Sequence, residues 1–96
     1  MSFTIIFSEK AKSNIEKIAE YLDEEWSENV KLKFLIDISK AVKQLAIMPF
    51  MFPSSDKMEG LRRCVVNRHT VLYYRINKEI IEVINVKGTR QSPNIN

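Results

Sequence analysis

The sequence predicts an α+β domain in the order β-αα-βββ, in which an N-terminal strand and a helical hairpin pack on an antiparallel sheet. Three observations support this prediction. Two long segments repeat apolar residues at helical spacing, the second half of the chain alternates β-branched and aromatic runs with tight turns, and 45% of the 96 residues are hydrophobic. One domain with a modest core fits this length. We therefore expect a single domain over 1–96, with a strand and helical hairpin in 1–47, a β-meander in 61–87 and a loose tail in 88–96.

The first strand and helix are predicted from the N-terminal segment. The run TIIF at 4–7 is short, apolar and β-branched, which is typical of a strand. Ser8 suits the N-cap of a following helix, and Glu9 interacts favourably with the helix dipole in the first turn. Apolar residues then recur at helical spacing between charged ones, so an amphipathic helix is predicted over 9–25.

A second helix is predicted directly after the first. Ser27 is a suitable N-cap, and an apolar stripe runs from Val30 to Leu45. The helix should stop before Pro49, because the residue preceding a proline disfavours the helical conformation. The link between the two helices is short, so they should form an antiparallel hairpin.

The segment 48–60, MPFMFPSSDKMEG, is predicted to be a loop because it contains two prolines, a Ser-Ser pair and a glycine. Its Phe50, Met51 and Phe52 favour a loop folded back over the core, and an exposed patch for a partner is the alternative.

The remaining elements read as three strands of a meander. LRRCVV at 61–66 and TVLYYRI at 70–76 flank the turn Asn67-Arg68-His69, and IIEVINV at 80–86 follows a second tight turn. Tyr73 and Tyr74 should point to opposite faces of their strand, so one belongs to the core and the other is available to a base or a partner protein.

The charge is unevenly distributed along the chain, whose net charge is +3. Residues 1–56 hold seven basic and nine acidic residues, a balance of −2, whereas 57–96 hold eight and three, a balance of +5. Every arginine lies in the second part. Arginine pairs with phosphate or carboxylate through two parallel hydrogen bonds, so the sheet and tail are the candidate surface for an anionic partner. Its candidate binding residues are Arg62, Arg63, Arg68, Arg75, Lys87 and Arg90.

Most catalytic chemistries lack their residues here. No HExxH, CxxC, GxGxxG or Walker pattern is present in the sequence, and we expect no metal or cofactor. Cys64 is the one cysteine, and in a strand pattern it should behave as a small buried hydrophobe. The sequence also shows no signal-peptide pattern and no membrane-length apolar run, so we expect a cytoplasmic protein without membrane contact.

RNA cleavage by attack of the 2′-hydroxyl is the chemistry that remains credible. It can proceed on positioned cations and a weak acid–base, because the developing charge on phosphate is the main feature to stabilise. Residues of the required types are Arg62, Arg63, His69, Tyr73, Tyr74, Arg75, Lys87 and Arg90.

Several segments in a fixed order indicate a family. They are the early strand, the helix start SEKAKSNIEKIAEYL, the helix end KQLAIMPFMFP, the strand start GLRR, the strand VLYYRI and the ending VINVKGTRQSP. Over nearly its whole length the chain resembles the RelE/ParE superfamily of bacterial type II toxin–antitoxin toxins. The resemblance implies the β-αα-βββ fold and a cognate antitoxin whose peptide wraps the toxin.

The superfamily has two functional branches. RelE-type members cleave mRNA in the ribosomal A site, and ParE-type members poison DNA gyrase. Arg62 and Arg90 match basic positions of the nucleases, but Cys64 and Val71 stand where further basic residues are expected. No tyrosine or histidine follows Arg90 to act as an acid or base. The resemblance therefore favours the ParE-like branch.

The preferred hypothesis is a non-enzymatic, ParE-like toxin that binds DNA gyrase or another topoisomerase and is neutralised by an antitoxin. The alternative is a RelE-like, ribosome-dependent mRNA endoribonuclease that would use Arg62, His69, Tyr73 and Arg90. A second alternative is a basic binding module without toxicity. A homodimer and a toxin–antitoxin hetero-oligomer are both open.

Overall fold

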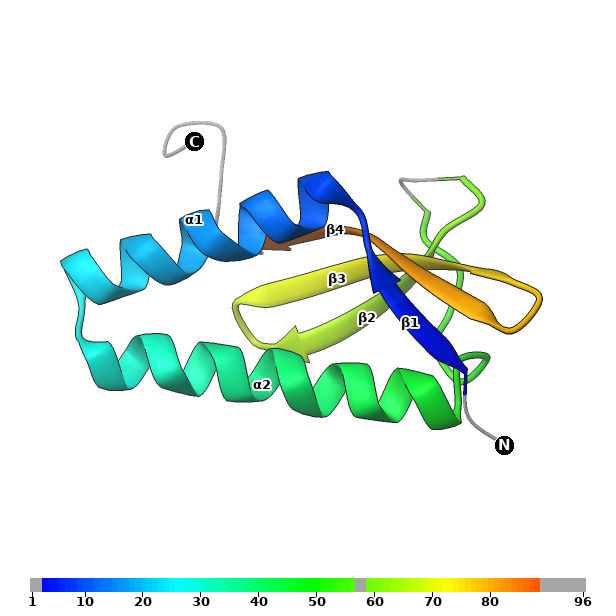
Figure 1. The fold of residues 1–96 in the computed structure, drawn as a ribbon, viewed down its shortest axis with the longest axis horizontal. Coiled ribbons are helices and arrows are strands. Elements are labelled where there is room, and N and C mark those ends of the chain that lie inside the picture. The colour runs from blue at the N-terminus through cyan, green and yellow to red at the C-terminus, as the bar shows by residue number, and fades with distance from the viewer. Residues whose placement is uncertain (1–2, 57–58, 89–96) are drawn as a thin grey trace.

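The computed structural model describes residues 3–56 and 59–88, and its elements follow the predicted order (Figure 1). The elements are β1 (Thr4–Phe7), α1 (Glu9–Glu25), α2 (Glu28–Ile47), β2 (Arg62–Asn67), β3 (Thr70–Asn77) and β4 (Ile80–Gly88). Of the predicted tail, Gly88 alone lies among these residues, as the last residue of β4. Neither α1 nor α2 is long and apolar enough to cross a membrane.

Both helices begin where serine caps were predicted. The Ser8 hydroxyl oxygen accepts a hydrogen bond from the Ala11 amide at 3.0 Å, and the hydroxyl donates to the Ile84 carbonyl at 2.8 Å. Ser27 caps α2 in the same way by accepting from the Val30 amide at 3.1 Å. Ser8 therefore also ties the start of α1 to β4.

The sheet has the strand order β1-β4-β3-β2. Strands β2, β3 and β4 form the predicted antiparallel meander. β1 pairs in parallel with β4 at the outer edge of this meander, from Thr4 opposite Ile80 to Phe7 opposite Val83. The complete sheet is therefore mixed. The register shifts twice, in β2 between Val65 and Asn67 and in β4 opposite Tyr73 and Tyr74. Each shift places one extra residue in a strand, as a β-bulge does.

The core lies between the helical hairpin and one face of the sheet. α1 packs on β4 and α2 on β2 and β1 (Figure 1). The buried core residues from the helices are Ala11, Phe34, Ile38, Ala41 and Leu45, and those from the sheet are Cys64, Leu72, Tyr74, Ile81, Val83 and Val86. We call the opposite side of the sheet the open face. By strand alternation and register, it carries Arg63, Val65, Val71, Tyr73, Arg75, Ile80, Glu82 and Lys87.

The loop after α2 is partly folded back on the core. Phe52 packs edge-to-face on Tyr74, with ring centroids 6.5 Å apart, and the Tyr74 hydroxyl donates to the Pro49 carbonyl at 2.5 Å. Phe50 and Met51 are 63% and 45% exposed. The two readings of this loop thus apply to different residues, because Phe52 packs on the core whereas Phe50 and Met51 face solvent.

Candidate target-binding surface

The two arginines that open β2 occupy adjacent strand positions, so their side chains point to opposite faces of the sheet. The Arg62 guanidinium lies on the helix side, where it donates to the Phe52 carbonyl at 2.5 Å and sits 5.2 Å from the centre of the Phe50 ring. The Arg63 side chain is exposed on the open face, and its backbone amide donates to the Pro53 carbonyl at 2.9 Å. Arg62 therefore holds the loop in place, whereas Arg63 is presented to solvent.

The open face concentrates positive charge. Arg63, Arg75 and Lys87 are exposed there, and Glu82 is the one acidic residue among its members. Arg75 pairs with that carboxylate through Nε at 2.9 Å and Nη2 at 2.8 Å. Three cations against one carboxylate leave this face positive.

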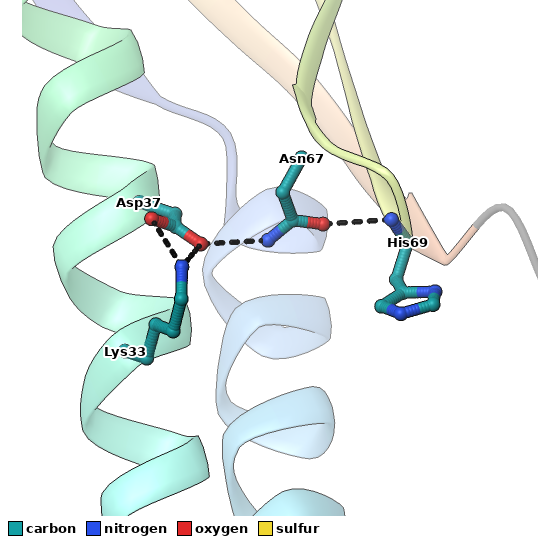
Figure 2. Close-up of polar contacts among 4 residues, drawn as sticks. All are labelled: Lys33, Asp37, Asn67 and His69. Carbon is teal, nitrogen blue, oxygen red and sulfur yellow. Dashed lines mark hydrogen bonds and ion pairs between the residues drawn. The ribbon is translucent and has the colours of Figure 1, made fainter.

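A third set of predicted residues lies at the β2–β3 turn, next to the middle of α2. The Asn67 side chain donates through Nδ2 to the Asp37 carboxylate at 2.9 Å, and its Oδ1 oxygen accepts from the His69 backbone amide at 2.8 Å (Figure 2). Lys33, one turn before Asp37, donates to both carboxylate oxygens at 3.1 and 3.4 Å. The imidazole of His69 extends away from these contacts and is exposed.

The Asp37 carboxylate is stabilised in its charged form. Burial raises its pKa, but the hydrogen bonds from Asn67 and Lys33 and the positive charges of Lys33 and Lys40 outweigh burial. The pKa of Asp37 therefore lies below its ordinary value of 3.8. At neutral pH this group is an ionised acceptor and is not suited to donate a proton.

The two tyrosines and the cysteine do not supply a reactive group near Arg62. Burial raises the pKa of the Tyr74 phenol to about 12, with Arg62 lowering it and Cys64 raising it, and burial raises the pKa of the Cys64 thiol to about 11. Both groups stay protonated at neutral pH, as expected for a core tyrosine and an inert cysteine. Tyr73 does point to the other face, but it is only 7% exposed.

The predicted nuclease residues do not lie together in the structure. Arg62 begins β2 and His69 lies in the turn beyond its other end, and the five positions from Arg62 to Asn67 alone span roughly 17 Å at about 3.3 Å per residue. Arg90 lies outside the described residues. Asp37 was missed by the sequence reasoning, although its place beside the buried stripe of α2 was a signal. Asn67 was read only as a turn residue, although asparagine before a two-residue turn is typical of an Asx-turn.

Comparisons with known proteins identify the family. The sequence model for the ParE toxin of the type II toxin–antitoxin system parDE matches residues 5–93. A comparison with curated protein sequences gave no significant match.

Solved structures share the fold. A chain of the chromosomal ParDE toxin–antitoxin system from P. aeruginosa superposes with a TM-score of 0.79 at 18% identity, covering 91% of this chain and 96% of that one. The RelBE2 toxin–antitoxin complex of Mycobacterium tuberculosis gives 0.64 at 15%, covering 92% and 99%. The DinJ–YafQ complex of E. coli gives 0.52 at 15%, covering 92% and 93%. At these identities the likeness establishes the fold, and the family follows from the match of the sequence model: the chain belongs to the ParE toxins of type II toxin–antitoxin systems.

Proposed function

We propose that this toxin arrests growth in the bacterial cytoplasm by binding DNA gyrase or a related topoisomerase, without cutting RNA. The observation that carries the proposal is the dispersal of the candidate nuclease groups. Arg62 donates to the loop after α2, His69 lies in the turn beyond the opposite end of β2, a strand that spans roughly 17 Å, and Tyr73 is buried. Cleavage needs an acid or base and a cation around one phosphate, whereas inhibition by binding needs only an extended complementary surface.

The open face is the surface we assign to the target. Its exposed cations Arg63 and Lys87 flank buried Tyr73 and Val71, and the side chain of Val65 is exposed beside Val71. Ile80 is exposed at the opposite end of the face, beyond Arg75 and Glu82. Arginine and aromatic side chains are among the residues enriched in protein interfaces. A net positive face also accelerates encounter with an anionic partner.

A cognate antitoxin is the second partner that we propose. The solved relatives include toxin–antitoxin complexes. In this chain, large apolar side chains are exposed along α2 and the following loop: Leu32, Leu35, Ile36, Ile47, Met48, Phe50 and Met51. Exposed apolar surface is typical of protein interaction sites, so a partner that covers these side chains would stabilise the toxin by binding to its folded state.

The test is inhibition of DNA supercoiling by purified gyrase. The double variant Arg63→Ala/Lys87→Ala should raise the half-inhibitory concentration by about 3- to 10-fold, since exposed charge contacts contribute modestly to affinity. The matched control is Lys10→Ala/Lys43→Ala, which removes the same charge from exposed positions on the helices and should leave inhibition unchanged. Equal losses in the two variants would mean that net charge, and not the open face, governs binding.

The nuclease alternative retains one supporting observation, because Arg68 and His69 are both exposed at the β2–β3 turn. Its test is the mapping of new mRNA 5′ ends after induction of the chain in a bacterium. Translation-dependent cuts in phase with codons, abolished by His69→Ala, would overturn the topoisomerase proposal. Growth arrest without such cuts would support it.

A further inference from the structure

The β2–β3 hairpin turn has an unusual backbone for its length. Asn67 pairs with Thr70, so the loop contains only Arg68 and His69. Two-residue hairpin loops usually adopt primed turns, in which at least one loop residue has positive φ. Among the described residues, positive φ occurs only at Lys78 and Gly60, so neither loop residue has it. The backbone conformation of this turn is therefore not the one that strand twist favours.

Side-chain contacts compensate for this. The register shift between Val65 and Asn67 adds a residue at the end of β2. The side-chain oxygen Oδ1 of Asn67 accepts a hydrogen bond from the His69 backbone amide. The Asn67 amide group is in turn held by Asp37 on α2 (Figure 2). One side chain thus makes both bonds, so its orientation couples the turn to the helix.

We infer that Asp37 and Asn67 are positioning residues, which set the conformation of the Arg68–His69 turn from α2 and pre-form it as part of the target-binding surface. The inference rests on the proposed function for its binding part alone. Lys33 supports this arrangement because its ammonium group pairs with the Asp37 carboxylate and holds it beside Asn67. A pre-formed turn increases the apparent affinity, because no binding free energy is used to order it.

The pair can be tested by exchanging its two residues. Asn67→Asp places a second carboxylate against Asp37, so the bond between the two side chains is lost. Their repulsion should then displace the side chain at position 67 from the orientation that accepts from the His69 amide. In the double variant Asp37→Asn/Asn67→Asp, the new amide at position 37 donates to the new carboxylate at position 67. That carboxylate can still accept from the His69 amide, and the total charge equals that of the unmodified chain, with one acidic group relocated.

Two readouts separate the inference from the proposed function. The first is hydrogen exchange of the His69 backbone amide by NMR, which needs no target. Asn67→Asp should speed this exchange about 10-fold or more, and the exchanged pair should restore protection. The second is inhibition of gyrase. Asn67→Asp should raise the half-inhibitory concentration about 3- to 10-fold, as expected if the competent turn falls to a minor population, and the exchanged pair should return it to within about 2-fold.

Controls exclude a general loss of stability. Ile38→Val removes a core methyl group near Asp37 in sequence and should destabilise the fold without changing inhibition. If Asn67→Asp fails to fold, Asn67→Ala replaces it, since its methyl group can neither accept from the His69 amide nor donate to Asp37. Unchanged exchange at His69, or no rescue by the exchanged pair, overturns the positioning role. A disordered turn with full inhibition overturns its part in target binding. Absence of inhibition by the unmodified chain refutes the proposed function and leaves the exchange result standing.

Discussion

Removal of the Tyr74 hydroxyl tests how much its hydrogen bond to Pro49 contributes to holding the loop after α2. Tyr74 is fully buried, and its hydroxyl donates to the carbonyl of buried Pro49 at 2.5 Å. Tyr74→Phe keeps the ring against Phe52 but leaves that carbonyl without its donor. A buried acceptor left unsatisfied costs about 1–3 kcal/mol. We expect unfolding free energy to fall by roughly 1.5–2 kcal/mol.

Urea unfolding followed by circular dichroism measures this loss. With an m-value of about 1.5 kcal/mol/M, the midpoint should fall by roughly 1 M. Tyr73→Phe is the matched control, because it removes the same hydroxyl from the neighbouring position on the other face. It should shift the midpoint by less than about 0.3 M. If both variants lose the same stability, the Tyr74–Pro49 bond does not fix the loop and the reasoning is refuted.

Three further predictions concern caps and ionisation. Ser8→Ala should cost about 1–2 kcal/mol in urea unfolding and Ser27→Ala about 0.5–1, because Ser8 also donates to β4; equal costs would contradict this. Burial raises the pKa of Cys64 from 9.0 to about 11, so the folded state keeps the thiol protonated where the unfolded state ionises. The contribution of the buried thiol to stability is complete below pH 9 and is lost as pH rises toward 11. Cys64→Ala should flatten that part of a pH–stability profile, and the thiol should react with a disulfide reagent only on unfolding. The pKa of Asp37 is lowered, so its contribution is present above about pH 4 and is lost as pH falls below that; Asp37→Asn should lack this acid-dependent loss.

The helices and their ends could be predicted because their signals are local. Ser8 and Ser27 mark both starts, and Pro49 marks the region where α2 has to end. The predicted range 9–25 coincides with α1 for this reason. Strand identities in the meander were also local, since a tight turn fixes which strands are neighbours.

Pairings between distant segments could not be predicted from local patterns. Nothing in TIIF specifies a parallel partner 76 positions away, and no local signal marks the extra residues at the two register shifts. Those shifts matter for the site because a one-residue change moves side chains to the other face. The faces of Arg62 and Arg63 were therefore undecided until the pairing of β2 with β3 was known.

The sequence predicted which residue types form the candidate site, and the structure then showed which of these side chains lie on the same surface. The cations of the open face were expected, but the engagement of Arg62 by the loop was not, because the Phe52 carbonyl is a backbone group without a sequence signature. The contact of Asp37 with Asn67 likewise joins a helix to a turn across 30 positions.

The placement of β1 beside β4 has a consequence for synthesis on the ribosome. β1 is made long before its partner strand, because Thr4 pairs with Ile80 at the start of β4 (Ile80–Gly88). The helical hairpin and the first turn of the meander can form earlier from neighbouring segments, whereas β1 can join the sheet only after β4 has left the exit tunnel. Pairing between such distant segments is intrinsically slow. A finished toxin domain therefore forms only after β4 has been made, and with a delay.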